Sequence, residues 1–248
     1  MSEQNKKIAL ITGANRGIGF ETARQLGQQG IKVLVGARTT ENGKEAETKL
    51  KNEGFDAEFI LLDVDNLKTH ETAAKYVNDN YGKLDILINN AGILIDDYQS
   101  STPTGASQTS QEVFRKTFDT NFFNTIAVTQ KFVPLIRKSD AGRIVFLSSI
   151  LGSLKLHGDP NSPIYNYKLP AYDISKTALN GYAVHLAHEL KDTNIKVNAA
   201  HPGSVLTDMN AQGDLTLEEG AKTSVDLALL DENGYTGKFI YLGEELPW

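Results

Sequence analysis

Short apolar runs alternate with amphipathic stretches along the whole chain. Apolar runs of about four to eight residues are typical of strands buried on both faces, whereas apolar residues three or four positions apart indicate helices. Alternating strands and helices predict an α/β protein with a doubly wound parallel sheet, three layers and a single domain over residues 1–248. The predicted strands are Ile8–Ile11, Ile31–Arg38, Phe59–Leu62, Leu84–Ile88, Arg143–Leu147, Ile195–Ala199 and Gly237–Tyr241. Two predicted helices begin after residues 19 and 66. Four others are predicted over 41–53, 112–137, 171–191 and 217–230.

The first predicted strand leads directly into a glycine-rich turn and then into a helix. The turn has a Gly-x-x-x-Gly-x-Gly spacing between Thr12 and Gly19. Glycines in this context permit a tight turn and a close approach of the backbone to a pyrophosphate, which faces the first amide groups of the helix. We therefore expect a dinucleotide to bind here. The expected contacts are Gly13, Asn15, Arg16, Gly17, Ile18 and Gly19.

The second predicted strand favours a phosphorylated cofactor. In folds that bind NAD, an acidic residue often ends this strand and binds the ribose 2′-hydroxyl. This chain has Arg38 at that position and Arg16 in the glycine turn. Two guanidinium groups suit a 2′-phosphate, although two solvated surface arginines are the alternative. The sequence thus predicts NADP(H) as the cofactor, with NAD(H) as the alternative.

Polar and small residues follow the other strands, at the edge where ligands bind in such sheets. Asp63 and Val64 end the third strand, where Asp63 either reaches an adenine amino group or caps the next helix. The N-cap candidates of that helix are Asp65 and Asn66.

The fourth and fifth strands end in residues that suit the same crevice. Ala91 and Gly92 permit close approach of the backbone to a cofactor, whereas Asn89 and Asn90 either face the site or only join strand ends. Ser148 and Ser149 end the fifth strand, either as site residues or as ordinary turn serines. The sixth strand is followed by Pro202, Gly203 and Thr207.

A tyrosine and a lysine four positions apart begin the helix predicted over 171–191. Tyr172 and Lys176 share one face of that helix, so the phenol is expected beside the ammonium. A neighbouring positive charge favours the phenolate, so we expect the pKa of Tyr172 to fall from about 10 toward working pH. A phenol tuned in this way is a general acid or base. An exposed pair without function is the alternative, and the glycine turn favours the catalytic interpretation.

Two stretches interrupt the alternation of strands and helices. Residues 95–111 are polar and predict a long exposed loop, of a kind that is often functional. Residues 152–170 are rich in Gly, Pro, Asn and Tyr and predict an insertion without regular structure. Asn121, within the helix predicted over 112–137, either holds a water or faces solvent.

Composition and charge exclude several classes of protein. The chain is 40% hydrophobic and 23% charged, which is ordinary for a globular protein. Its net charge of −6 and lack of a basic block indicate no nucleic-acid partner, and the lack of cysteine excludes disulfides and cysteine catalysis. Neither a signal peptide nor a membrane span is visible, so we expect a cytoplasmic protein without a membrane partner. His185, His188 and Glu189 lack a further ligand nearby in sequence, so we expect no metal site.

In combination, these motifs resemble the short-chain dehydrogenase/reductase family, and within it the carbonyl-reductase-like branch, over nearly the whole chain. The resemblance implies a Rossmann fold and NADPH-dependent reduction of a small-molecule ketone or aldehyde to an alcohol, with the reverse oxidation. The residues that carry it are Thr12-Gly13-x-x-x-Gly17-Ile18-Gly19, Asn89-Asn90-Ala91-Gly92, Asn121, Ser149, Tyr172-x-x-x-Lys176 and Pro202-Gly203. The stretches 218–221 and 237–248 look like the tail of monomeric carbonyl reductases.

The resemblance also implies roles for individual residues. Tyr172 would donate a proton to the carbonyl oxygen, which Ser149 would hold by a hydrogen bond. Lys176 would hold the nicotinamide ribose hydroxyls and keep the tyrosine acidic. Asn121 would anchor a water that links Lys176 to solvent, and Thr207 would contact the nicotinamide carboxamide.

One departure from the family concerns the length of the segment between Ser149 and Tyr172. These residues are 23 positions apart, which is longer than in most of the family. In carbonyl-reductase-like members an insertion there covers the helix face used for tetramer assembly, so a monomer is favoured over a homo-oligomer. The insertion is also expected to wall the substrate pocket or to pack as an ordinary loop, through Leu154, Leu156, Ile164, Tyr165 and Tyr167.

Three other functions remain as alternatives. They are an NAD-preferring alcohol dehydrogenase of the same family, an epimerase or dehydratase on the same scaffold, and a non-catalytic NADP-binding regulator. Epimerases and dehydratases usually add a substrate domain, and regulators tend to lose the tyrosine or the lysine, which are both present here.

Overall fold

The computed structural model describes residues 6–97 and 104–248. Residues 1–5, and 98–103 within the predicted loop, lie outside the described residues, and the predictions for them stay predictions. On either side of this gap the predicted loop has no helix or strand until residue 111.

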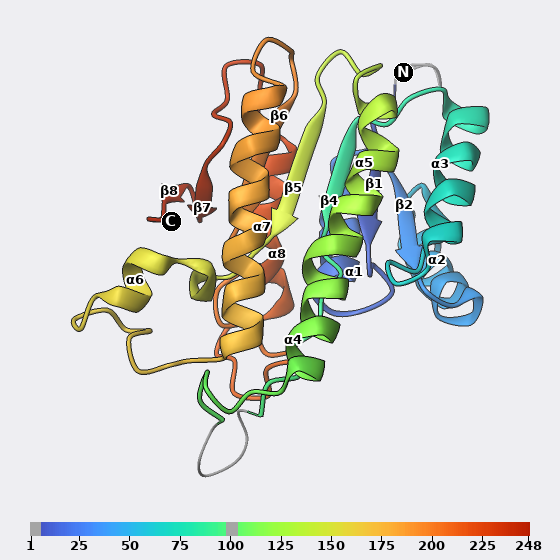
Figure 1. Ribbon diagram of the computed structural model, residues 1–248. Coiled ribbons are helices and arrows are strands. Elements are labelled where there is room, and N and C mark those ends of the chain that lie inside the picture. Colours follow the sequence, from blue (N-terminus) through green and yellow to red (C-terminus); the bar gives the residue numbers. More distant parts are fainter. Residues whose placement is uncertain (1–5, 98–103) are drawn as a thin grey trace.

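The strands of the described residues form one sheet, in the order β3-β2-β1-β4-β5-β6-β7-β8 (Figure 1). All neighbouring strands are parallel except β7 and β8, which are antiparallel. The predicted doubly wound sheet in a single domain is thereby confirmed. The strands are β1 Ile8–Thr12, β2 Lys32–Ala37, β3 Ala57–Leu61, β4 Ile86–Asn89, β5 Arg143–Leu147, β6 Lys196–Ala200, β7 Phe239–Tyr241 and β8 Glu244–Glu245.

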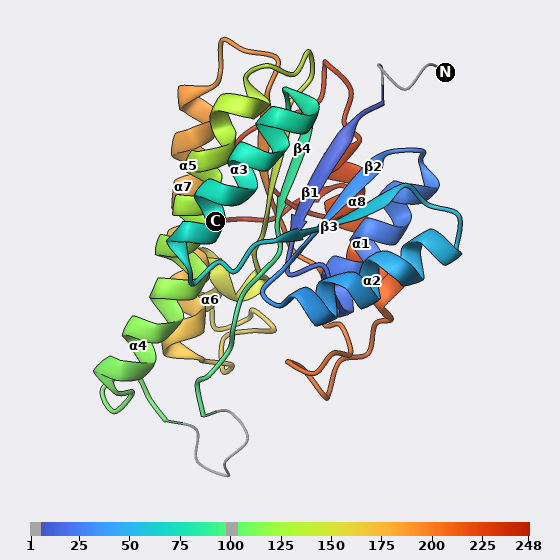
Figure 2. The ribbon, with the colours of Figure 1, turned by 90° about the vertical axis from the view of Figure 1, so that its right-hand side faces the viewer.

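Helices cover both faces of the sheet and complete three layers, as Figure 2 shows. One face carries α1 Gly17–Gln28, α2 Thr40–Asn52 and α8 Leu217–Ala228, and the other carries α3 Leu67–Tyr81, α5 Thr125–Ile136 and α7 Pro170–Glu189. The two remaining α-helices that the structure describes are α4 Gln111–Phe118 and α6 Leu154–Gly158. Within residues 6–97 and 104–248, no helix is long and apolar enough to cross a membrane.

The strands are apolar on both faces because both faces are covered. Successive side chains of a strand point to opposite sides. In β1, Leu10 belongs to the core beneath α3, α5 and α7, whereas Ala9 and Ile11 belong to the core beneath α1, α2 and α8. This double burial produces the unbroken apolar runs of the sequence.

Three local predictions are wrong in part. The helix predicted over 112–137 is divided into α4 and α5 by a π-helical turn at Asp119–Asn124. The insertion at 152–170 does contain regular structure, since α6 follows a 3-10 turn at Ile150–Gly152 and is capped by Ser153. The sheet also continues beyond the last predicted strand, because residues 242–243 turn the chain back so that β8 pairs with β7.

Candidate active site

The carboxyl ends of the strands line one large cleft of about 1390 Å³. The cleft lies where the strand order reverses, between β1 and β4, which is where ligands bind in open α/β sheets. Apart from Asn121, every residue that the sequence predicts as catalytic or cofactor-binding lines this cleft. These are Gly13, Asn15, Arg16, Gly17, Ile18, Gly19, Arg38, Asp63, Val64, Asn90, Ala91, Gly92, Ser149, Tyr172, Lys176, Pro202, Gly203 and Thr207.

The glycine turn has the geometry of a phosphate site. Gly13 and Gly17 have φ angles of 65° and 58°, which side chains rarely permit. A Cβ atom on Gly17 would meet no described atom within 4 Å, so the backbone faces open space there. Among the described residues, no side chain caps the first amides of α1 and no acidic residue lies in its first turn. These amides and the helix dipole are therefore available to an anion.

Asn90 holds the glycine turn against β4. Its Nδ2 donates to the carbonyl oxygens of Thr12 at 2.8 Å and Gly13 at 3.3 Å. The Thr12 hydroxyl in turn accepts the backbone N–H groups of Asn90 and Ala91, both at 3.0 Å. A Cβ atom on Gly19 would lie 2.4 Å from Asn90 Nδ2, so glycine is required there. Asn90 thus has the structural role that the sequence left open, although it also lines the cleft.

Two arginines line the cleft beside the glycine turn. Arg38 directly follows β2 and is exposed. Arg16 forms an ion pair with Asp208, which joins the glycine turn to the loop after β6. Both partners are largely exposed, so the pair contributes little to stability. Asp208 was not predicted, because a contact across such a separation in sequence depends on the tertiary fold.

Asp63 stays at the cleft and does not cap α3. Asn66 is the N-cap, since its side chain accepts the backbone N–H of Lys68 at 3.2 Å. Asp63 accepts the N–H of Asp65 at 3.1 Å in a local turn. The interpretation of Asp63 as the helix cap is therefore wrong, and its contact with an adenine amino group stays a prediction.

Ser149, Tyr172 and Lys176 meet in the same cleft. Ser149 hydrogen-bonds the Tyr172 phenol. Lys176 Nζ lies 5.5 Å from the centre of the Tyr172 ring and donates to the carbonyl oxygen of Leu147 at 2.7 Å. Both residues lie in the first turns of α7, which starts at Pro170. A proline suits this first position, because its missing N–H needs no partner there.

The expected fall in the pKa of Tyr172 is wrong for this structure. Burial raises the pKa of Tyr172 above its ordinary value, and the hydrogen bond from Ser149 offsets this only in part. Burial lowers the pKa of Lys176 to about 8. The physical reason is desolvation, since the ammonium donates to a backbone carbonyl and makes no hydrogen bond to the phenol.

Asn121 lies behind the wall of the cleft, on the π-helical turn. Its Oδ1 accepts the Ile93 N–H at 2.7 Å, and its Nδ2 donates to the Ile93 carbonyl at 2.8 Å and to Ser175 Oγ at 3.1 Å. A Cβ atom on Gly92 would lie 3.3 Å from Asn121 Oδ1 and 3.6 Å from Lys176 Nζ. Asn121 is therefore buried close to Lys176 and does not face solvent.

Asp96 binds the start of α7 and was not identified from the sequence. Its carboxylate oxygens accept the N–H groups of Ala171 at 2.9 Å and Tyr172 at 3.0 Å. A carboxylate at a helix N-terminus stabilises the helix through hydrogen bonds and through its dipole. The polar stretch around Asp96 gave no signal that distinguished it from its neighbour Asp97.

Part of the insertion forms a wall of the cleft. Ile164 and Tyr167 line the cleft, whereas Leu154, Leu156 and Tyr165 lie outside the set of described residues that line it. The Leu154 side chain, in α6, is instead 66% exposed. Further apolar residues that line the cleft are Leu94, Leu151, Leu169, Leu206 and Met209.

His201 joins the ends of β5 and β6. Its Nδ1 accepts the N–H groups of Ile150 at 3.2 Å and Gly203 at 3.3 Å. Burial lowers the pKa of His201 to about 4, so the ring is neutral at physiological pH. This contact fixes the stretch that contains Pro202 and Gly203 beside Ser149.

A family model described as "short chain dehydrogenase" matches residues 7–217, which include the glycine turn, Ser149, Tyr172 and Lys176. The chain belongs to this family. The (+)-neomenthol dehydrogenase of Arabidopsis thaliana is 35% identical to it, over 93% of this chain and 94% of that protein. This protein is therefore an oxidoreductase that acts on carbonyl or alcohol groups. The predicted resemblance to the carbonyl-reductase-like branch of the family is confirmed.

Solved structures of the family share this fold. The salutaridine reductase of Papaver somniferum has a TM-score of 0.81 and is 31% identical, over 94% of this chain and 99% of that chain. A variant of the actinorhodin polyketide ketoreductase with NADPH has a TM-score of 0.82 and is 25% identical, over 98% of this chain and 97% of that chain. The Rossmann fold and a nicotinamide cofactor follow from these likenesses.

Proposed function

We propose that this protein reduces a ketone or an aldehyde to an alcohol with NADPH and catalyses the reverse oxidation with NADP. The observation that carries the proposal is the convergence of Ser149, Tyr172 and Lys176 on the cleft that also contains the glycine turn. A proton donor and an anion site in one cleft suit a reaction in which a carbonyl gains a hydride and a proton.

The residues of the cleft fit a nicotinamide cofactor that has a 2′-phosphate. The uncapped amides of α1 would hold the pyrophosphate, and Arg16 and Arg38 would hold the 2′-phosphate. The NADPH in the similar ketoreductase structure supports this preference over NADH. When bound, the cofactor supplies the hydride. We assign Asp63, Val64, Ala91, Gly92, Pro202, Gly203 and Thr207 to the same cofactor.

The protein's own residues supply the proton that the carbonyl oxygen gains. Tyr172 gives its proton to the carbonyl oxygen, which Ser149 positions by a hydrogen bond. Burial keeps the phenol protonated, as a donor requires. Lys176 would hold the ribose hydroxyls of a bound cofactor and would supply positive charge beside the phenolate that forms. Asn121, buried behind Gly92 and beside Lys176, would anchor the water that returns a proton.

The apolar wall of the cleft favours an uncharged substrate of some bulk. Leu151, Ile164 and Leu169 come from the segment between Ser149 and Tyr172 and line the same cleft, so they would offer an apolar surface to a substrate. Of the basic groups that line the cleft, the Lys176 ammonium donates to the Leu147 carbonyl and His201 is neutral, while Arg16 and Arg38 lie beside the glycine turn. A carboxylate or phosphate on the substrate would thus lose its hydration without gaining a partner.

The monomeric state and the cytoplasmic location stay part of the proposal. The insertion packs along α7, where Thr177 Oγ1 donates to the carbonyl of Gly152 at 3.0 Å. The monomer otherwise rests on the resemblance to carbonyl-reductase-like members, because Ile174, Val184 and His188 leave one face of α7 exposed. Sedimentation of the purified protein would test this state.

The proposal is tested by oxidation of NADPH and of NADH at 340 nm with a panel of aryl ketones, cyclic ketones, diketones and aldehydes. We expect turnover with apolar ketones and a preference for NADPH. A preference for NADH would favour the NAD-dependent alcohol dehydrogenase. Tight NADPH binding without turnover on any substrate would favour the non-catalytic regulator.

A further inference from the structure

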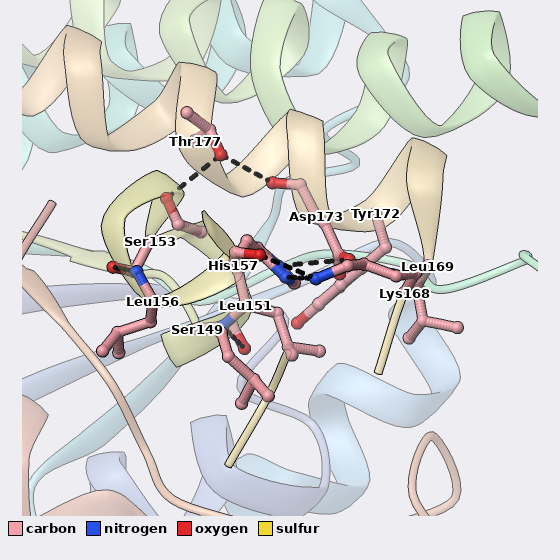
Figure 3. Close-up of polar contacts among 12 residues, drawn as sticks. Ser149, Leu151, Ser153, Leu156, His157, Lys168, Leu169, Tyr172, Asp173 and Thr177 are labelled. Atoms are coloured by element: carbon pink, nitrogen blue, oxygen red, sulfur yellow. Dashed lines mark hydrogen bonds and ion pairs between the residues drawn. The ribbon is translucent and has the colours of Figure 1, made fainter. Parts of the chain in front are cut away.

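His157, in α6, makes polar contacts with three separate parts of the chain (Figure 3). Its Nε2 lies 2.9 Å from the Leu151 carbonyl oxygen and 3.3 Å from Asp173 Oδ2. Its Nδ1 lies 2.8 Å from Lys168 Nζ, which also donates to the His157 carbonyl at 3.1 Å. The His157 side chain is only 13% exposed, so its contacts with Leu151 and Asp173 are largely shielded from water, whereas Lys168 is exposed.

Each of these contacts joins His157 to a neighbour of the site. Leu151 lies two residues after Ser149 and lines the cleft, and Asp173 directly follows Tyr172. Lys168 ends the stretch 153–168, which we call the pocket-wall segment because it contains Ile164 and Tyr167. The imidazole thus connects the segment to Leu151 and Asp173, which are close in sequence to Ser149 and Tyr172.

The hydrogen bonds require a neutral ring with its proton on Nε2. The Leu151 carbonyl can only accept, and the Lys168 ammonium can only donate, so Nδ1 must be the acceptor. Burial, together with the charge of Lys168, lowers the pKa of His157 and favours this neutral form.

The other titratable groups around the ring complete a compact polar cluster. Asp173 accepts the Leu169 N–H at 2.8 Å, and its other oxygen is buried without a partner among the described residues. Burial and the nearby Asp96 raise the pKa of Asp173 to about 7. On the outer side, the ammonium of Lys168 lies 5.2 Å from the centre of the Tyr165 ring.

We propose that His157 is a positioning residue, whose ring holds the pocket-wall segment against Ser149 and Tyr172 and thereby sets the affinity of the cleft for the substrate. This inference rests on the proposed function. The pocket-wall segment has little backbone support of its own, since only α6 within it is regular and its remaining residues form turns. One backbone hydrogen bond, from Lys155 N–H to the Trp248 carbonyl at 3.0 Å, ties α6 to the end of the chain. Side-chain contacts must hold the rest of the segment, and His157 supplies contacts at both ends.

The test compares His157→Phe with His157→Gln, whose amide can still donate to Leu151 and accept from Lys168. His188→Phe is the matched control, because His188 lies on the exposed face of α7. The loss of two hydrogen bonds predicts that His157→Phe raises KM for an apolar ketone about tenfold. The Kd for NADPH should change less than about twofold, and His157→Gln should restore most of the KM. Hydrogen exchange in residues 159–168 should rise in the phenylalanine variant and stay unchanged in the control.

The outcomes separate this inference from the proposed function. Suppose that the wild type turns over ketones and that a folded His157→Phe variant has an unchanged KM and unchanged hydrogen exchange. This result would leave the proposed function in place and overturn the role of His157 alone. Equal losses in ketone KM and NADPH affinity, unrestored by glutamine, would also overturn it, since they indicate general destabilisation. A wild type without turnover would overturn the proposed function, and the positioning role with it.

Discussion

The ammonium of Lys176 lies over the face of the Tyr172 ring, 5.5 Å from its centre, while its hydrogen bond goes to the carbonyl oxygen of Leu147 at 2.7 Å. The lysine therefore supplies charge near the phenol without binding its hydroxyl. That hydroxyl is left to Ser149, which places the two groups that would contact a substrate carbonyl side by side.

Removal of the phenol hydroxyl should abolish most of the activity. Tyr172→Phe is expected to lower kcat for ketone reduction by about 10²–10⁴-fold, because it removes the proton donor. The Kd for NADPH, measured by fluorescence titration, should change little. Tyr165→Phe is the matched control, since Tyr165 lies in the insertion that precedes α7 and outside the described lining of the cleft. Retention of more than a tenth of wild-type kcat in Tyr172→Phe would exclude the tyrosine as the acid.

The pH dependence should differ between the two directions. The pKa of Lys176 is lowered to about 8, so its positive charge is present below that pH and is lost above it. We expect kcat/KM for ketone reduction to be level from pH 6 to about 7 and to fall above about 8. Alcohol oxidation should rise with pH instead, because Tyr172 must first lose its proton. Initial rates in both directions from pH 6 to 10 check this, and an oxidation rate that is flat over that range would contradict it.

Arg38 should determine the choice of cofactor. Arg38→Ser removes a guanidinium group beside the expected 2′-phosphate, so the ratio of kcat/KM with NADPH to that with NADH should fall about tenfold or more. Arg115→Ser is the control, since Arg115 is exposed on α4 and lies outside the described lining of the cleft. An unchanged ratio in Arg38→Ser would remove the basis for the predicted NADP preference.

Ile164 should limit the size of the substrate. The side chain is 8% exposed and lines the cleft, so Ile164→Phe narrows the pocket. We expect kcat/KM to fall about tenfold for a bulky ketone, as overpacking of this size predicts, and to fall less than about twofold for a small aldehyde. Leu154→Phe, at an exposed position, should change neither value. Equal losses for both substrates would instead indicate a general distortion of the site.

Much of the site could be predicted because the fold brings strand ends together. A parallel sheet places the residues after β1, β2, β3, β4, β5 and β6 at one edge, so motifs far apart in sequence meet there. Gly13, Arg38, Gly92 and Ser149 were found in this way, and all of them line the cleft.

Residues that act through tertiary contacts escaped prediction. Asp96 and His157 lie in stretches without periodicity, and their importance comes from the backbone groups and side chains that they meet in space. The pKa of Tyr172 was predicted in the wrong direction for a related reason. A helix spacing shows which groups are neighbours, but desolvation depends on how the whole chain packs around them.

The π-helical turn at Asp119–Asn124 could not be predicted either. Apolar spacing indicates a helix on both sides of it, and one extra residue in a turn hardly alters that pattern. The turn carries Asn121, whose contacts with Ile93 join it to the stretch after β4.

The pocket-wall segment also bears on how such an enzyme diversifies. Residues 153–168 contribute no strand to the sheet, and they hold their place through side chains such as His157 and Lys168 and through one backbone hydrogen bond from Lys155 to Trp248. The glycine turn, by contrast, is fixed by backbone geometry at Gly13, Gly17 and Gly19. Mutations in this one short stretch can therefore change the substrate range, while selection keeps the residues around the glycine turn unchanged. A descendant with a new specificity is expected to differ here first, and grafting this stretch between relatives is the direct way to exchange their substrates.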